Sequence, residues 1–392
     1  MTSRQAAENA RLRRCSVAPR CGVSDDTPRS SLPSRLGTHA KRGSGRFRQP
    51  VGDTNRSRRA AALALAAAGL QAAGPARAQF TLGDQRVGTS SGTFLRIGVG
   101  ARAQGLGESF VAVANDPSAI FWNPAGLASL QRQEALFSHV DWPAEIRYEH
   151  LAYVLPVRRL GGSVAFQLGM LSTEIDETTE FHPFGTGRSF VYSDLVVGAA
   201  YARRWTDKLL VGAGLKYVRE DLGADVGGPR TNAVLVDIGS IYYLGLGSVR
   251  IATSLSNFGP ELKPRDPNRS DGRWVSPVTG EQRTYDGFDP PTVFRYGLAF
   301  EAIENSQQRL TTSLEINQPA DDAQVLKTGL EWAWQRRLAL RAGYNFNADE
   351  LNFSAGAGVY ASIGETQGTV DYAYTDGGVL GAIHRLSLGM RF

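Results

Sequence analysis

The feature that most constrains this fold is a period-two alternation of apolar and polar residues, in segments of about ten residues that turn residues separate. Within residues 325–334, Leu330 and Trp332 fall on one face of an extended chain, whereas Lys327 and Glu331 fall on the other. One such face suits lipid and the other suits a polar interior. The sequence therefore predicts an all-β fold, a transmembrane antiparallel β-barrel with a short N-terminal helical plug.

Alternating segments follow one another from residue 134 to the C-terminus. They lie near residues 134–140, 147–154, 160–172, 190–203, 208–219, 232–244, 247–257, 292–301, 309–318, 325–334, 338–346, 352–363, 366–374 and 384–392. Period two alone would also suit a soluble sandwich or propeller. Every second connection is short, for example 364–365, whereas the others reach the length of 258–291. Short periplasmic turns with longer outer loops favour a barrel of about 14 strands over residues 134–392.

The longest connection, residues 258–291, holds six prolines. Loops longer than about 15 residues are usually functional or disordered, and the prolines argue against a hidden strand pair. We expect this loop to lie outside the cell, with Trp274, Tyr285 and Phe288 as anchors for a partner.

The N-terminus has the pattern of an export signal. Three arginines within residues 56–59 precede the apolar run Ala60–Leu70, and the small-residue site Ala76–Ala78 follows. This run is shorter than the roughly 20 residues that span a bilayer. We predict a cleaved signal peptide over residues 56–78 and a location in the cell outer membrane of a Gram-negative-type cell. N-terminal sequencing should find the mature chain at or near Gln79; a start at Met1 would refute this.

Charge is distributed unevenly along the chain. The first 78 residues hold 15 Lys and Arg but only four acidic residues, so the pI near 9.2 comes from the leader. A basic balance confined to a leader gives no support to a nucleic-acid partner. Residues 1–55 are predicted to be a disordered or mistranslated extension, and both cysteines lie there, at Cys15 and Cys21. A mature chain without cysteine excludes disulfides and thiol catalysis.

No enzymatic activity is expected, and no cofactor or metal. After the leader there are only four histidines, which are His139, His150, His182 and His384. No catalytic triad or metal-ligand spacing surrounds them. Gly98, Gly100 and Ala103 fit a dinucleotide-binding pattern, but no strand and crossover helix follow.

Several charged and aromatic residues have predictable places on a barrel. Nine charged residues would mostly face the lumen and pair across strands: Asp194, Asp237, Glu315, Glu331, Asp371, Lys216, Arg295, Lys327 and Arg341. Interface depths favour amphipathic rings. We expect a periplasmic belt of Trp205, Tyr242, Tyr243, Trp334 and Phe392, and an outer belt of Tyr217, Tyr344, Phe346, Tyr372 and Tyr374.

The last segment ends on an aromatic residue. Leu386, Leu388, Met390 and Phe392 alternate onto one face. This pattern resembles the C-terminal signal that the outer-membrane assembly machinery reads, so we expect that machinery and outer-membrane lipid as partners.

The segment over residues 79–133 is predicted to be a plug or hatch at the periplasmic mouth of the barrel. Asp116-Pro117 and Asn123-Pro124 each place a side-chain acceptor at an N-cap and a proline at the first helical position. Glycines between residues 98 and 107 permit close packing.

This segment also carries a family resemblance. Gly100-Ala101-Arg102-Ala103 and Asn123-Pro124-Ala125-Gly126-Leu127 resemble the N-terminal pattern of the PorV/PorQ family, itself similar to FadL-type channels, which share Asn-Pro-Ala in the hatch and a fourteen-stranded barrel. Ser256–Pro260 resembles a further family motif at the end of a strand. The resemblance covers roughly residues 90–392. The plug residues it singles out are Gly100, Ala101, Arg102, Ala103, Asp116, Asn123, Pro124, Ala125 and Gly126.

The resemblance implies two different functions. PorV-like members act in type IX secretion, where they receive substrates that have crossed the outer membrane, and type IX components would then be partners. FadL-like members conduct hydrophobic molecules such as fatty acids through a hatch and a lateral opening. The Gly-Ala-Arg-Ala pattern favours the first function, and a FadL-like channel is the alternative.

Overall fold

The structure, a computed structural model, describes residues 87–392 apart from 179, 225–227, 270, 276–279, 336 and 349. All described residues belong to one compact unit. The predicted signal peptide and the extension before it lie outside the described residues. Within the part described, no helix is long and apolar enough to cross a membrane.

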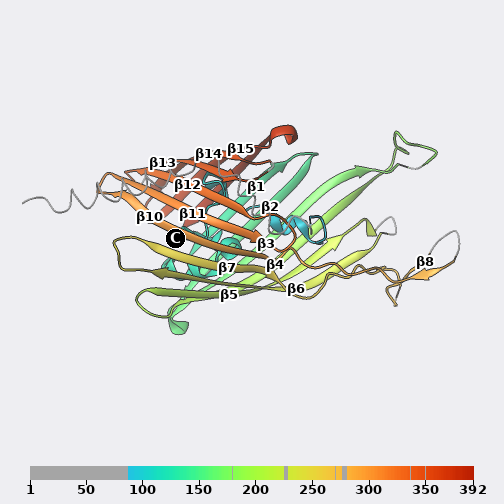
Figure 1. Cartoon of the computed structure of the whole chain (residues 1–392), viewed down its shortest axis with the longest axis horizontal. Helices are drawn as coiled ribbons and strands as arrows, with labels where there is room; N and C mark the ends of the chain where they lie inside the picture. Colours follow the sequence, from blue (N-terminus) through green and yellow to red (C-terminus); the bar gives the residue numbers. More distant parts are fainter. Residues whose placement is uncertain are drawn as a thin grey trace, which may run out of the picture. The chain divides into compact units, whose positions relative to one another are not determined.

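Fourteen strands close into an antiparallel barrel (Figure 1). They are β1 (Glu134–Trp142), β2 (Ile146–Val157), β3 (Gly162–Asp176), β4 (Ser189–Arg204), β5 (Leu209–Asp221), β6 (Arg230–Tyr243), β7 (Arg250–Phe258), β10 (Val293–Glu304), β11 (Gln308–Pro319), β12 (Val325–Trp334), β13 (Leu338–Phe346), β14 (Phe353–Ile363), β15 (Thr366–Asp376) and β16 (Ala382–Arg391). Neighbours in the chain are neighbours in the barrel, and β1 closes it against β16. The predicted fold class is confirmed.

Alternation along each strand separates an apolar outer wall from the lumen. In β12, Leu330 is 46% exposed on the outside, whereas Lys327 and Glu331 are buried inside. The outer faces of the other strands repeat this pattern, for example at Phe166 and Val359. A closed barrel with an apolar outer wall is the fold of an outer-membrane protein.

The predicted aromatic belts need one correction. Trp205, Tyr242, Trp334 and Phe392 are exposed near the short-turn ends of their strands. Tyr243, however, shares the inward parity of buried Ile241 in β6 and packs against the buried core. The prediction for Tyr243 was therefore wrong, because a one-residue step along a strand moves a side chain to the other wall.

The two ends of the barrel differ in their connections. One end has the short turns 158–161, 205–208, 244–249, 305–307, 335–337 and 364–365. The other end holds the short β1–β2 turn 143–145 but also the longest loops, and the hairpin of β3 and β4 (green) extends there well beyond most strands (Figure 1). By the general habit of such barrels, the short-turn end faces the periplasm.

The long loop after β7 contains a strand pair that the sequence did not predict. The strands β8 (Trp274–Val275) and β9 (Gln282–Arg283) pair antiparallel outside the barrel. Leu262 and Phe288 form a further bridge near the base of the loop. The prolines do not prevent this pairing, because none of the paired residues is a proline.

Candidate functional site

In the described residues, four short helices precede β1 and lie in the lumen. They are η2 (Thr93–Arg96), α2 (Ala101–Gly105), α3 (Ala119–Trp122) and η3 (Pro124–Ser129). Helices this short are not stable alone, so the barrel wall must hold them.

The predicted caps fit one helix fully and the other in part. Asn123 caps η3 by accepting a hydrogen bond from the backbone N–H of Ala125 at 3.1 Å, with Pro124 at the first helical position. Asp116 caps the preceding turn instead. Its Oδ1 accepts from the backbone N–H of Ser118 at 3.0 Å, and α3 begins only at Ala119.

This plug runs around the inside of the wall, strand after strand. From Ala101 onward its polar contacts with the wall include, in chain order, Ala101 N–H to Ser387 Oγ of β16 (2.8 Å), Ser313 Oγ of β11 to the Ser109 carbonyl (2.8 Å), Arg250 Nε of β7 to the Ala112 carbonyl (2.6 Å), Asn123 Nδ2 to the Ser240 carbonyl of β6 (3.2 Å) and Ser163 Oγ of β3 to the Leu130 carbonyl (3.2 Å). The chain then enters β1. The plug therefore completes a circuit of the lumen.

Glycines on the lumen face let the plug lie directly on the wall. They are Gly356 of β14, Gly343 of β13, Gly329 of β12, Gly297 of β10, Gly239 of β6 and Gly212 of β5. A methyl group at Gly329 would lie 2.7 Å from the Leu106 carbonyl oxygen, and one at Gly343 would overlap the backbone of Gly107. Glycine inside a strand often marks such a close approach.

The sequence suggested a plug at the periplasmic mouth of the barrel. In the structure, the plug extends beyond that mouth. At its start, the backbone N–H of Gly92 donates to Glu220 at 2.7 Å. Arg96 pairs with Asp321 and Asp322 at 3.3 and 2.5 Å. These acidic residues lie at the long-loop end, so the plug extends from one end of the lumen towards the other.

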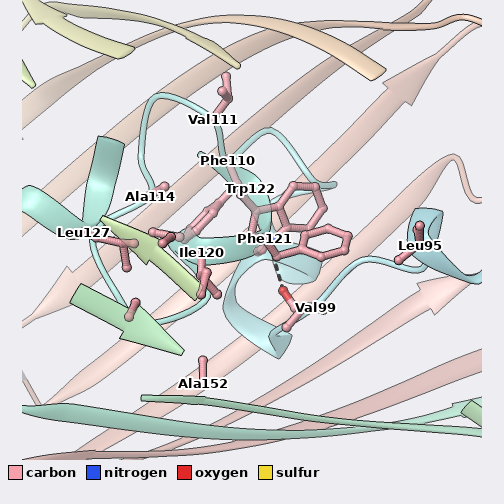
Figure 2. Close-up of a cluster of buried hydrophobic side chains, with 14 of the residues drawn as sticks. Leu95, Val99, Phe110, Val111, Ala114, Ile120, Phe121, Trp122, Leu127 and Ala152 are labelled. Carbon is pink, nitrogen blue, oxygen red and sulfur yellow. Dashed lines mark hydrogen bonds between the residues drawn. The ribbon is translucent and has the colours of Figure 1, made fainter. Parts of the chain in front are cut away.

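An apolar cluster forms the centre of the plug (Figure 2). Trp122 is 1% exposed, and its indole N–H donates to the Val99 carbonyl at 2.9 Å. The rings of Phe110 and Phe121 meet Trp122 edge-on at 6.2 and 5.0 Å. Small and medium apolar side chains of the nearby wall are buried in the same cluster: Ala152, Val154, Ala165, Ala200, Ala202, Leu210 and Ile241.

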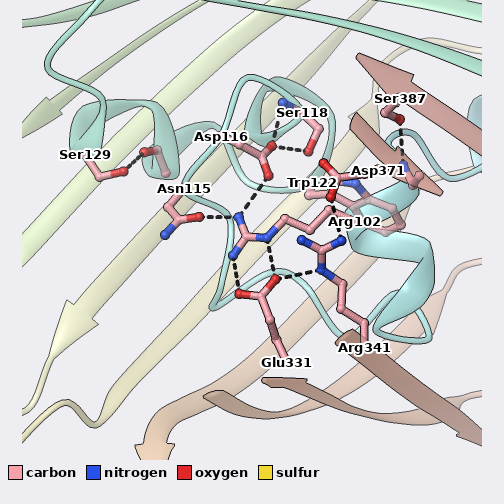
Figure 3. Close-up of polar contacts among 12 residues, drawn as sticks. Arg102, Asn115, Asp116, Ser118, Trp122, Ser129, Glu331, Arg341, Asp371 and Ser387 are labelled. Carbon is pink, nitrogen blue, oxygen red and sulfur yellow. Dashed lines mark hydrogen bonds and ion pairs between the residues drawn. The ribbon is translucent and has the colours of Figure 1, made fainter. Parts of the chain in front are cut away.

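Buried ion pairs join helix α2 of the plug to strands β12 and β13 (Figure 3). Arg102 of α2 donates from Nε and Nη2 to the Glu331 carboxylate at 2.8 and 3.0 Å, and from Nη1 to Asp116 at 3.0 Å. Arg341 of β13 donates to Glu331 at 2.8 Å and to Asp371 at 2.6 Å. Glu331 therefore joins the plug to two strands of the wall, and paired guanidinium and carboxylate groups satisfy one another's buried charge.

Ion-pair partners in the plug and the wall decide whether the buried plug residues Arg102 and Glu108 are charged. Burial on its own lowers the pKa of Arg102, but the carboxylates of Glu331 and Asp116 outweigh it and raise that pKa above its ordinary value. Burial likewise opposes ionisation of Glu108. The Lys327 ammonium, 2.6 Å away, nevertheless lowers the pKa of Glu108 to about 2. Both residues are therefore charged at neutral pH.

The nine charged residues predicted to face the lumen all do so, each 5% exposed or less. Some pair across strands as expected, as Lys216 does with Asp237 at 2.8 Å. Others contact the plug, which the sequence did not indicate. Glu315 accepts hydrogen bonds from the backbone N–H groups of Phe110 and Val111 at 2.9 and 2.8 Å.

The Ser256–Pro260 motif has a structural explanation. Asn257 has a φ of +62° at a β-bulge in β7, and its backbone N–H donates to Asp237 at 2.7 Å. Its side chain accepts from Lys216 at 2.5 Å and donates to the Pro291 carbonyl at 2.9 Å. Both ends of the long loop are thus tied to one buried ion pair.

The remaining motif residues occupy distinct places. Gly100, with a φ of +86°, precedes α2, and Ala101, Ala103 and Ala125 are fully buried. A methyl group at Gly126 would overlap the Ala114 carbonyl. In β16 and directly after it, the residues of the predicted assembly signal are 43–50% exposed on the outer wall: Leu386, Leu388, Met390 and Phe392.

A polar cavity of about 730 Å³ lies between the plug and the short-turn end. Its lining includes Arg102 and Asp116 of the plug, Arg309 of β11 and Tyr360 of β14. The ion-paired residues Arg102 and Asp116 of the plug therefore border this cavity.

Comparisons with known proteins found one matching family model and a set of similar solved structures. Residues 68–216 match the sequence model of an uncharacterised protein family, UPF0164. No curated protein matches the chain. Among solved structures, the toluene transporter TbuX of Ralstonia pickettii has 14% identity and a TM-score of 0.49, covering 75% of this chain and 97% of that one.

Two further structures are similar at comparable or lower levels. The toluene transporter TodX of Pseudomonas putida has 12% identity and a TM-score of 0.48, covering 75% of this chain and 97% of its own. The outer membrane protein Omp33 of Acinetobacter baumannii has 9% identity and a TM-score of 0.35, covering 67% of this chain and 98% of its own.

Proposed function

We propose that this chain is an outer-membrane barrel resembling PorV/PorQ that acts in type IX protein secretion or surface delivery, through its outer surface rather than through an open pore. The observation that carries the proposal is the circuit of the plug. Backbone contacts at the lumen glycines and the buried Arg102–Glu331 pair bind the plug to the wall. Opening a path through the lumen would require separating that buried pair. Removing one partner of such a pair destabilises a fold by about 3–5 kcal/mol.

The long-loop end offers a surface for a secreted protein. At the tip of the β3–β4 hairpin, Phe181 is 88% exposed and Phe184 is fully exposed. Phe288, at the base of the long loop, is 46% exposed. Of the other predicted anchors, Tyr285 is half-buried. Exposed aromatic side chains rimmed by polar residues are typical of protein-binding sites.

The test replaces the two hairpin rings in the native host by Phe181→Ser and Phe184→Ser. A matched control replaces Val379 and Leu380 by serine, since these exposed apolar residues lie in the β15–β16 loop at the same end. Heat-modifiable gel mobility confirms that each barrel forms. Surface delivery of secreted proteins should fall in the hairpin variant and stay normal in the control. Normal delivery in both variants would contradict the proposal.

A FadL-like channel for hydrophobic molecules such as fatty acids is the second candidate. The observation that favours it is the apolar lumen wall nearer the long-loop end, where Val140, Tyr148, Leu171 and Val196 are buried. Uptake of a labelled fatty acid by cells carrying Val196→Asp tests this candidate, with Val197→Asp on the outer wall as the control for barrel damage. Uptake lost only in the Val196 variant, with normal protein delivery, would favour the channel.

A further inference from the structure

Three short turns at the periplasmic end join into one surface. The Tyr201 hydroxyl donates to the Leu160 carbonyl at 2.6 Å, which ties the β4–β5 side to the β2–β3 turn. The backbone N–H of Tyr243 donates to the Lys208 carbonyl at 2.8 Å, which ties in the β6–β7 turn. We name this the basic turn surface, and its residues are Arg158, Arg159, Leu160, Arg203, Arg204, Trp205, Lys208 and Leu246.

The basic turn surface has a strong excess of positive charge. All five of its cations are exposed, and in the described part of the chain none of them forms an ion pair. Asp207 is the single acidic residue within the turns themselves. On the opposite side of the barrel, Glu304 at the end of β10 and Glu365 in the β14–β15 turn instead balance Arg309 near the start of β11 and Arg337 in the β12–β13 turn. The charge is therefore local to the β2–β7 side.

Apolar side chains interleave with these cations at the edge of the outer wall. Trp205 is 61% exposed, Leu160 55% and Leu246 70%. Arg203 points outward, because the neighbouring Ala202 is fully buried on the lumen side, and its guanidinium lies 4.7 Å from the centre of the Trp205 ring. Long cations and indole rings prefer the headgroup layer, where an apolar part enters lipid and the charge stays at its surface.

We propose that the basic turn surface binds the phosphate groups of anionic phospholipids in the periplasmic leaflet. Charge complementarity and depth both favour this occupant. Arginine suits phosphate because its planar fork donates two parallel hydrogen bonds. An acidic soluble protein would not account for Trp205 and the outward Arg203 at the lipid-facing edge of β4.

The test measures lipid retention by the purified full chain in detergent, using native mass spectrometry. The probes are dioleoylphosphatidylglycerol and dioleoylphosphatidylcholine, with glycerol 3-phosphate as the headgroup alone. One variant changes the five cations to glutamine: R158Q, R159Q, R203Q, R204Q and K208Q. The matched control removes five exposed cations at the long-loop end: R147Q, R188Q, K263Q, R269Q and R273Q. Heat-modifiable mobility must show that both variants fold.

The wild type and the control should retain phosphatidylglycerol over phosphatidylcholine by at least about fivefold, the factor expected from one cation near an anionic surface. The turn variant should retain both lipids about equally, and glycerol 3-phosphate should not bind stably. A preference unchanged in the turn variant, or equally lost in the control, would overturn the proposal. So would a wild type that prefers neither lipid, and an acidic periplasmic protein would then be the better occupant.

Discussion

The two halves of the barrel wall hold the same plug by different physics. In β1–β6 the buried side chains facing the lumen are mostly apolar: Leu136, Val140, Tyr148, Ala152, Val154, Ala165, Leu171, Val196, Ala200, Ala202, Leu210, Val218, Ala233, Leu235 and Ile241. In β10–β16 the wall is rich in buried charge: Arg295, Glu315, Lys327, Glu331, Arg341, Asp371 and Arg385. Apolar packing is non-directional, whereas paired charges require defined geometry. Packing therefore stabilises the plug, and the charged half fixes its orientation.

The largest effect should come from breaking the charged half at its centre. Glu331→Gln leaves the buried guanidinium groups of Arg102 and Arg341 short of a carboxylate, so the free energy of unfolding should fall by about 3–5 kcal/mol. Leu127→Ala in the apolar half should cost about 2–5 kcal/mol by leaving a cavity. Urea unfolding measures both losses.

The two variants should also differ in how accessible the plug is to protease. Glu331→Gln should make the plug accessible to protease in the folded barrel, whereas Leu127→Ala should lower stability and leave the plug protected. If the plug resisted protease equally in both variants, the charged half would not be what fixes the orientation of the plug.

A charge on the outer wall should harm the barrel more than one in the charged lumen. Leu330→Arg places a cation in lipid and should cost about 2–4 kcal/mol near the midplane. Thr311→Lys, on the lumen side, would lie opposite Glu331 in the ladder and should be tolerated better. Folding yields into vesicles measure the difference, and equal yields would contradict the assigned faces.

Close backbone contact should matter in both halves alike. Gly343→Ala in the charged half and Gly212→Ala in the apolar half would each overlap plug backbone, at Gly107 and Pro124, and overpacking costs about 1–3 kcal/mol. Gly368→Ala is the control, since its nearest neighbour lies at 4.0 Å. A loss in only one half, measured by thermal unfolding, would show that the circuit is incomplete.

The smallest effect concerns pH. The pKa of Glu108 is about 2 in the fold against its ordinary value of 4.5, so its pairing with Lys327 contributes stability above pH 4.5, and this contribution is lost as the pH falls towards 2. The stability gap between the wild type and Glu108→Gln should be constant from pH 7 to 5 and then narrow. A gap that already closes above pH 5 would contradict this ion pair.

The sequence predicted the wall better than its contents. Period-two alternation depends on neighbouring residues, so the strand positions and the inward facing of residues such as Lys327 and Glu331 could be predicted. The partner of Arg102 could not, because Glu331 lies 229 residues away and nothing local indicates which strand the plug meets. The prediction for Tyr243 failed because the parity of a residue along its strand, and not its place at a strand end, decides whether its side chain faces the lumen or the lipid. The depth of the plug was misjudged for the same reason. Glu220 and Asp321 contact Gly92 and Arg96 across long distances in the sequence, and no local pattern indicates those contacts.

The most direct test of the account is the electrical conductance of the purified full chain in a planar bilayer. A plug that completes the circuit predicts no steady conductance above background in the wild type. The Glu331→Gln variant, whose plug is released on one side, should show intermittent openings. A stable, porin-like conductance in the wild type would contradict the closed lumen on which the account rests.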